Sequence, residues 1–143
     1  MPDFLGLPYP IVNTPNGLIA QSSGVEQIKA DLTQLLLTNP GSRCMLPLFG
    51  TPLSTLFFQP NDNTTLAQAK QMISNAIKTW EPRIIVQGIT VMNSQTGLTS
   101  NMLNPNDDLS ELGEILFIRI DFFDPGNISV IQSLTLNVPL GGG

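Results

Sequence analysis

The chain has 143 residues, of which 41% are apolar and 12% are charged, and its formal net charge at pH 7 is −5. This length and apolar content predict one folded domain over residues 1–143, whereas the acidic balance argues against binding to nucleic acid or to an anionic membrane. Because histidine is absent, the commonest general base and the commonest zinc ligand are excluded. The charged share is about half of that in a typical domain, which fits either a surface that neighbouring proteins cover or a small neutral surface rich in Asn, Gln, Ser and Thr.

The first part of the sequence predicts an arm followed by a helix. Residues 1–17 are rich in proline and glycine and are interpreted as an extended arm, and residues 18–20 are compatible with a short strand. Ser23 and Glu26 have the spacing of a capping box. Apolar residues then recur at helical intervals, at Val25, Ile28, Leu32, Leu35 and Leu36. Turn chemistry at residues 39–41 predicts that this helix ends near Thr38.

A second helix is predicted after an apolar segment. Residues 43–50 are apolar apart from Arg43, and residues 53–58 are expected to form a short helix or turn. Thr64 or Thr65 is the expected cap of the second helix, whose apolar stripe runs to Trp80. Residues 18–80 are therefore predicted to be mainly helical.

Residues 81–138 are predicted to be mainly β. Apolar residues alternate after Pro82, and strands are expected near residues 83–93, 114–123 and 128–137. The turn at residues 124–127 predicts that the last two strands form an antiparallel hairpin, while residues 93–113 are interpreted as a long polar excursion and residues 139–143 as a flexible tail. The predicted fold class is α+β, with two main helices and a short helix on one face of a small antiparallel sheet.

The change from helical to strand period occurs at Trp80-Glu81-Pro82-Arg83, hereafter the corner. Proline fixes this junction because it cannot donate an interior helix bond. Glu81 and Arg83 could serve as a structural ion pair, as two solvated charges or as a preorganised docking point for a partner. Arg43 is the one charge between Asp31 and Asp62, and a buried arginine needs a planar acceptor. A structural ion pair between Arg43 and Glu81 is therefore predicted.

The other candidates for chemistry are weak. Residues 104–111 fail as a calcium loop, because Leu109 stands where the turn glycine is needed. The acids at 107, 108, 111 and 114 could suggest a glycosidase pair, but no cleft that would raise one pKa is indicated. The single cysteine, Cys44, cannot form an internal disulfide, which is consistent with synthesis in the cytosol. We expect no catalytic residue, no metal and no cofactor.

The order of these signals resembles the baseplate wedge, or sheath-initiator, family of contractile-tailed phages, which includes the wedge subunits of type VI secretion baseplates and R-type pyocins. The resemblance spans about residues 5–137. It is carried by the corner, by Phe49-Gly50 and by Gly41-Ser42-Arg43 where the family commonly has Gly-Glu-Arg. It implies a structural subunit of the virion tail baseplate, assembled in the host cytoplasm, with no enzymatic activity. An adaptor of a type VI or pyocin machine is the alternative, and a peptidoglycan-cleaving glycosidase is less favoured.

The resemblance also implies partners. Glu81, Pro82 and Arg83 would dock on the helical core bundle of other wedge proteins, the C-terminal sheet would receive the first ring of tail sheath subunits, and hub or tube proteins are further candidate partners. Six copies per baseplate are expected.

The last strand is a candidate for pairing with the sheath. Residues 128–138 carry no charge, whereas isolated proteins usually protect an edge strand with lysine or proline. Backbone groups on such an edge can pair with a strand from another chain. The predicted sheath-facing residues are Ile128, Ser129, Val130, Ile131, Gln132, Ser133, Leu134 and Thr135. The alternative is that residues 93–113 or the N-terminal arm cover this edge.

Overall fold

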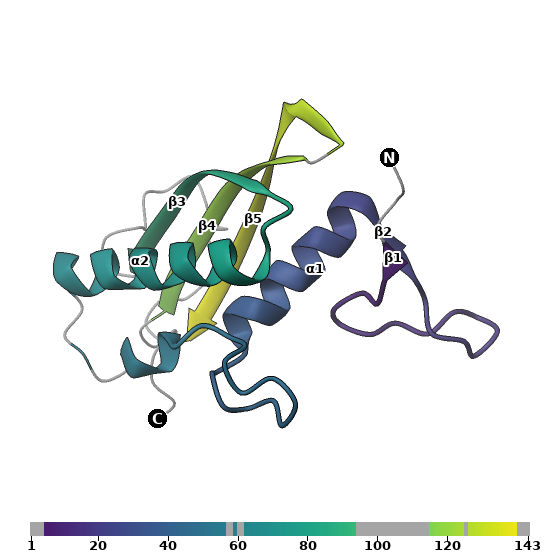
Figure 1. Ribbon diagram of the computed structural model, residues 1–143, viewed down its shortest axis with the longest axis horizontal. Coiled ribbons are helices and arrows are strands. Elements are labelled where there is room, and N and C mark those ends of the chain that lie inside the picture. The colour runs from purple at the N-terminus through teal and green to yellow at the C-terminus, as the bar shows by residue number, and fades with distance from the viewer. Residues whose placement is uncertain (1–4, 57–58, 60–61, 94–114, 125, 140–143) are drawn as a thin grey trace, which may run out of the picture.

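The computed structural model describes residues 5–56, 59, 62–93, 115–124 and 126–139. Its main elements are helices α1 (Gly24–Leu37) and α2 (Asn63–Trp80), the 3-10 helix η1 (Leu53–Leu56), and strands β3 (Ile85–Asn93), β4 (Ile115–Asp124) and β5 (Asn127–Pro139). The two helices lie over the same face of the sheet (Figure 1) and share one hydrophobic core with it. The α+β prediction is confirmed.

Helix α1 begins and ends close to the predicted residues, but its N-terminus differs in detail. Ser23 is the N-cap residue, yet its side chain makes no capping hydrogen bond. Instead, the preceding Ser22 donates its hydroxyl to Oε1 of Gln27 in the first turn. The predicted apolar stripe is the buried face, and it includes Ile28, Leu32, Leu35 and Leu36.

Helix α2 begins earlier than the predicted threonine caps. Asp62 is the N-cap residue, and its carboxylate accepts hydrogen bonds from the backbone N–H and the hydroxyl of Thr65, at 2.9 and 3.1 Å. These bonds favour the charged form and lower the pKa of Asp62, with the backbone N–H of Thr65 as the main cause. An aspartate in extended conformation can therefore satisfy the orphan N–H groups that the threonines were expected to serve.

The sheet is an antiparallel meander in the order β3-β4-β5. Alternate residues of β4 are buried against the helices, whereas Arg119 and Asp121 lie on the opposite face and form an ion pair of 3.0 Å. Helix α2 contacts β3 and helix α1 contacts β5, so each outer strand has a helix beside it. Within the described ranges, β5 pairs with β4 alone, as expected for an edge strand.

Residues 5–23 form a folded-back segment, hereafter the N-terminal hairpin, that projects from the helices and sheet (Figure 1). Its base is the antiparallel pair β1 (Leu5–Gly6) and β2 (Ser22–Ser23). The backbone N–H of Ala20 donates to the carbonyl of Val12 at 2.8 Å farther along. The paired strand therefore lies just after residues 18–20, where a strand was considered, and Ile19 takes part only in an isolated bridge with Asn13.

The loop between α1 and η1, residues 38–52, returns to the end of α1. Thr51 is fully buried, and its backbone N–H and hydroxyl donate to the carbonyls of Thr38 and Leu35, at 2.9 and 3.2 Å. Gly50 has φ +125°, and a Cβ at this position would lie 2.3 Å from the carbonyl oxygen of Thr38. Only glycine permits both this conformation and this close approach.

Candidate functional site

The corner joins α2 to β3 at a rigid turn. Glu81 is the C-cap residue, and its backbone N–H donates to the carbonyl of Ile77 at 2.8 Å. Pro82 follows and is exposed. Only 7% of the Glu81 side chain is exposed to solvent, compared with 30% of the Arg83 side chain. The corner therefore combines a buried carboxylate with a partly accessible guanidinium.

Arg83 is held by two carboxylates. Its Nε donates to Oε1 of Glu81, and its Nη2 donates to the other carboxylate oxygen, Oε2, at 2.7 Å. The same Nη2 donates to Oδ2 of Asp31 on helix α1 at 2.8 Å. These contacts raise the pKa of Arg83, and the hydrogen bonds to Glu81 are the largest cause. The guanidinium is consequently fixed in one orientation and remains charged.

Asp31 was not among the residues predicted from the sequence. It lies 52 positions before Arg83, so only the packing of α1 beside the corner brings the two side chains together. One local signal was available: Gln27 precedes Asp31 by four residues, and glutamine and aspartate at this spacing can bond on one helix face. The Nε2 of Gln27 does donate to Oδ1 of Asp31, at 2.7 Å.

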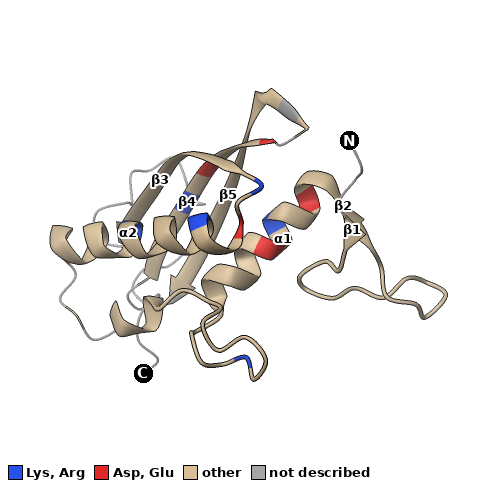
Figure 2. Cartoon of the chain, in the orientation of Figure 1, with Lys and Arg blue, Asp and Glu red and all other residues tan. Residues whose placement is uncertain are grey.

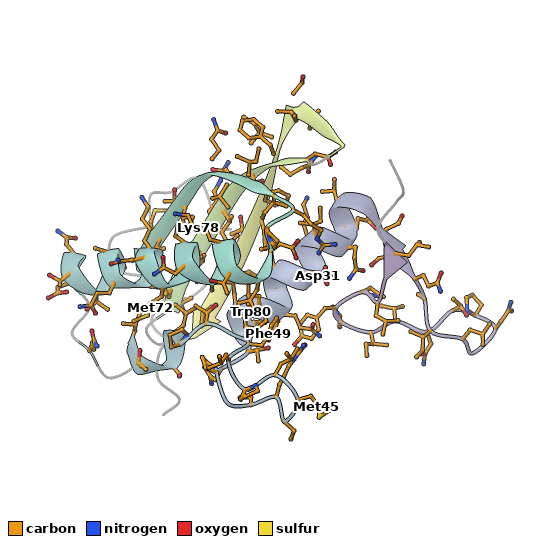
Figure 3. All side chains as sticks on the ribbon, viewed as in Figure 1. Asp31, Met45, Phe49, Met72, Lys78 and Trp80 are labelled. Atoms are coloured by element: carbon orange, nitrogen blue, oxygen red, sulfur yellow. The ribbon has the colours of Figure 1, made fainter. Side chains whose placement is uncertain are left out.

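The predicted ion pair between Arg43 and Glu81 is wrong. Arg43 places its guanidinium carbon 4.2 Å from the ring centre of Phe49 and donates from Nη2 to Oε1 of Gln34 at 2.9 Å. Phe49 in turn meets Trp80 edge-on, with ring centroids 5.3 Å apart (Figure 3). Arg43 thus packs on an aromatic ring and bonds an amide oxygen. The carboxylate of Glu81 is bonded instead by Arg83, which follows Glu81 by two residues.

Strand β5 presents the predicted sheath-facing residues at the sheet edge. Ile128, Val130 and Ile131 are exposed, as are Ser129, Ser133 and Thr135. Ile131 is paired with Phe123, which is paired with Ile85, so an apolar row crosses the sheet on the face opposite the helices. Gln132 and Leu134 alternate with these residues and are only partly exposed.

Two further surfaces expose apolar side chains. The N-terminal hairpin contains no charged residue (Figure 2), and its leucine, isoleucine, valine and tyrosine side chains are at least 45% exposed. In the α1–η1 loop, Met45 is 92% exposed and points away from the core (Figure 3). Exposed apolar side chains that lie close together in the sequence make both segments candidates for contact with other proteins.

The candidate acids of the glycosidase and calcium hypotheses, at 107, 108, 111 and 114, lie outside the described residues. Among the residues that the structure does describe, no group of three or more His, Cys, Asp or Glu could hold a metal ion. No helix in the described part of the chain has the length and apolarity needed to cross a bilayer.

Comparison with known proteins identifies one family that this chain matches. The family model for baseplate wedge protein gp25 matches residues 22–105. The chain belongs to this family. It is 30% identical over 114 residues to baseplate wedge protein gp25 of Enterobacteria phage T4, covering 80% of this chain and 76% of that protein. It is 27% identical over 101 residues to baseplate protein W of Escherichia phage P2, covering 70% and 86%.

Solved structures show the same fold at lower identity. A putative tail lysozyme from Geobacter sulfurreducens has a TM-score of 0.63 and 23% identity, over 82% of this chain and 91% of that one. A chain of the anti-feeding prophage baseplate has a TM-score of 0.60 and 16% identity, over 97% and 87%. The resemblance inferred from the sequence is confirmed: this is a baseplate wedge-type protein of contractile tail systems, a structural component of the virion tail baseplate.

Proposed function

We propose that this wedge subunit docks on a helical bundle of partner wedge proteins through the corner and then offers its sheet to the first tail sheath subunits. The observation that supports docking is the arrangement of Glu81 and Arg83. A nearly buried carboxylate fixes a guanidinium that remains 30% exposed. Pro82 holds the turn between them and is itself exposed.

The energetics of this pair favour a role in recognition. Burying a carboxylate costs desolvation energy that an ion pair only roughly repays, so such a pair adds little to stability by itself. The pair does fix the orientation of the Arg83 guanidinium. A side chain that is already ordered loses less conformational freedom when a partner binds. The planar fork of Arg83 suits a partner carboxylate or the carbonyl groups at the end of a partner helix.

The sheet supports the second half of the proposal. Strand β5 is long, uncharged over residues 128–138 and paired on one side in the described structure. An added strand from a sheath subunit would gain affinity from backbone hydrogen bonds and specificity from alternate side chains. The chain would act without enzymatic chemistry, and hub or tube proteins would be its other neighbours.

Six copies per baseplate fit this arrangement, since the anti-feeding prophage baseplate with the similar chain is described as 6-fold symmetrised. Assembly would take place in the host cytoplasm before the tail is complete. A role as an adaptor in a type VI secretion or pyocin machine would use the same corner and the same sheet, and the genes beside this one would distinguish the machines.

The docking half is tested by substituting Arg83 with lysine. Arg83→Lys keeps the positive charge but removes the planar fork, so we expect the folded variant to lose most of its binding to the purified wedge complex in a pull-down. Arg119→Lys is the matched control, because Arg119 also pairs with an aspartate but lies on the outer face of the sheet. Wild-type binding by Arg83→Lys would refute docking through the corner.

A further inference from the structure

A chain of polar side chains connects the N-terminal hairpin to the corner. Ser22 in β2 donates to Oε1 of Gln27, and Nε2 of Gln27 donates to Oδ1 of Asp31 at 2.7 Å. The other oxygen of Asp31 accepts from Nη2 of Arg83 at 2.8 Å. Four side chains from the hairpin, α1 and the corner are thus joined without a gap.

Gln27 is the centre of this chain. It is only 5% exposed, although glutamine normally lies on the surface. Its amide has one suitable orientation here, because the carbonyl oxygen faces the hydroxyl of Ser22 and the nitrogen faces Asp31. On the hairpin side, Gly6 of β1 packs so closely that an added Cβ would lie 2.4 Å from the Gln27 amide. The Gln27 side chain therefore contacts both strands at the base of the hairpin, Ser22 in β2 and Gly6 in β1.

Asp31 in turn decides how the guanidinium of Arg83 lies relative to α1. Glu81 alone would fix Arg83 within its own turn, since the two residues are neighbours in sequence. The bond to Asp31 ties the guanidinium to a different element. Charge-assisted hydrogen bonds of this kind are stronger than neutral ones, and networks of them transmit a change at one member to the others.

We propose that Asp31 and Gln27 are positioning residues for Arg83, and that they link the packing of the N-terminal hairpin to the corner. A partner wedge protein that binds Arg83 would then also order the uncharged hairpin. The exposed apolar side chains of the hairpin would form a second surface that contacts the same partner. The linkage within the free protein is independent of the docking role, whereas its effect on partner binding rests on the proposed function.

Hydrogen–deuterium exchange on the isolated protein tests the linkage. Gln27→Met keeps a side chain of similar length without the amide, and Asp31→Asn removes the charge. In these two variants and in Arg83→Ala, we expect the backbone amides of residues 5–23 to exchange at least roughly threefold faster, relative to the amides of β4. The reason is that each substitution weakens the hydrogen bonds that hold Gln27 in contact with the hairpin. Arg83→Ala is the most informative variant, since Arg83 bonds Glu81 and Asp31 and is connected to the hairpin through Asp31, Gln27 and Ser22.

Asp121→Asn is the matched control. Asp121 is also a partly exposed aspartate paired with an arginine, but it lies on the outer face of the sheet, so hairpin exchange should stay at the wild-type rate. If hairpin exchange is unchanged in both Asp31→Asn and Arg83→Ala, the linkage does not exist.

The binding consequence is measured separately with the purified wedge complex. The complex should slow exchange of residues 5–23 in the wild type and slow it much less in Gln27→Met. If the wild-type complex forms but leaves hairpin exchange unaltered, the second contact surface is refuted. If Arg83→Lys binds the complex normally, the docking function fails, and the exchange data on the isolated protein still decide the linkage.

Discussion

At the scale of single residues, the central feature is the choice of partner for the buried Glu81. The sequence suggests Arg43 and Arg83 as candidate partners, and in the structure Arg83 bonds the carboxylate through both Nε and Nη2. A bidentate contact from a neighbour two residues away requires little ordering of the chain. Arg43 instead stacks on Phe49, whose ring contacts Trp80, so both arginines contribute to the corner by different interactions.

A double-mutant cycle tests this assignment. Glu81→Ala and Arg83→Ala should show a coupling free energy of about 1–2 kcal/mol, below the value for a fully buried pair because Arg83 is partly solvated. Glu81→Ala and Arg43→Ala should be additive within about 0.5 kcal/mol. The free energies of unfolding come from urea titrations of the wild type, the three single variants and the two double variants. Additivity for Glu81 and Arg83 would contradict the assignment.

At the scale of elements, the α1–η1 loop depends on a glycine. The backbone of Gly50 has φ +125°, and a side chain there would meet the carbonyl oxygen of Thr38 that accepts from Thr51. Because Thr51 also caps the end of α1 through its hydroxyl, a shift of this loop would disturb the helix terminus. It would also disturb Phe49, which supports the corner through Trp80.

Substituting alanine at two glycines of this loop separates strain from steric conflict. Gly50→Ala should lower the free energy of unfolding by about 3 kcal/mol, since it adds a clash to a backbone conformation that is costly for other residues. Gly41→Ala should cost only about 1 kcal/mol, because Gly41 also has positive φ but has open space around it. Thermal or chemical denaturation would show the difference, and equal losses for the two variants would argue against a steric role for Gly50.

At the scale of the whole molecule, the corner and the edge of the sheet are separate surfaces on one rigid core. The corner lies where α2 turns into β3, whereas β5 is the strand at the opposite side of the sheet. Both are supported by the same buried cluster of helix and sheet residues. One chain can therefore hold a partner at each surface, as the proposed wedge and sheath contacts require.

Proline scanning of β5 should separate the two activities. Along an edge strand, backbone N–H groups point alternately to the neighbouring strand and outward, so of Gln132→Pro and Ser133→Pro only one removes an outward donor. That variant should stay folded and bind the wedge complex, yet fail to start sheath assembly, as seen by electron microscopy of baseplates mixed with sheath protein. The other variant breaks the β4–β5 ladder and should be markedly less stable. Normal sheath growth on the folded proline variant would exclude strand addition at this edge.

The sequence by itself determined the local structure of this protein. The positions of α1, α2 and the strands followed from hydrophobic period and from turn chemistry such as Asn39-Pro40-Gly41, because these signals act over a few residues. The order of short motifs also indicated the family that the comparisons confirm. Local competition explains the small errors, such as Asp62 rather than a threonine capping α2.

Only the tertiary structure decided which charges meet. The sequence predicted Arg43 as the partner of Glu81, whereas Arg83 takes that place in the structure, and the sequence did not point to Asp31 at all. The choice depends on how α1 lies beside the end of α2, and that packing is set by the whole core rather than by any nearby residue. Side-chain pairing across elements is a property of their three-dimensional arrangement, which is why the corner could be located from the sequence but its ion-pair network could not.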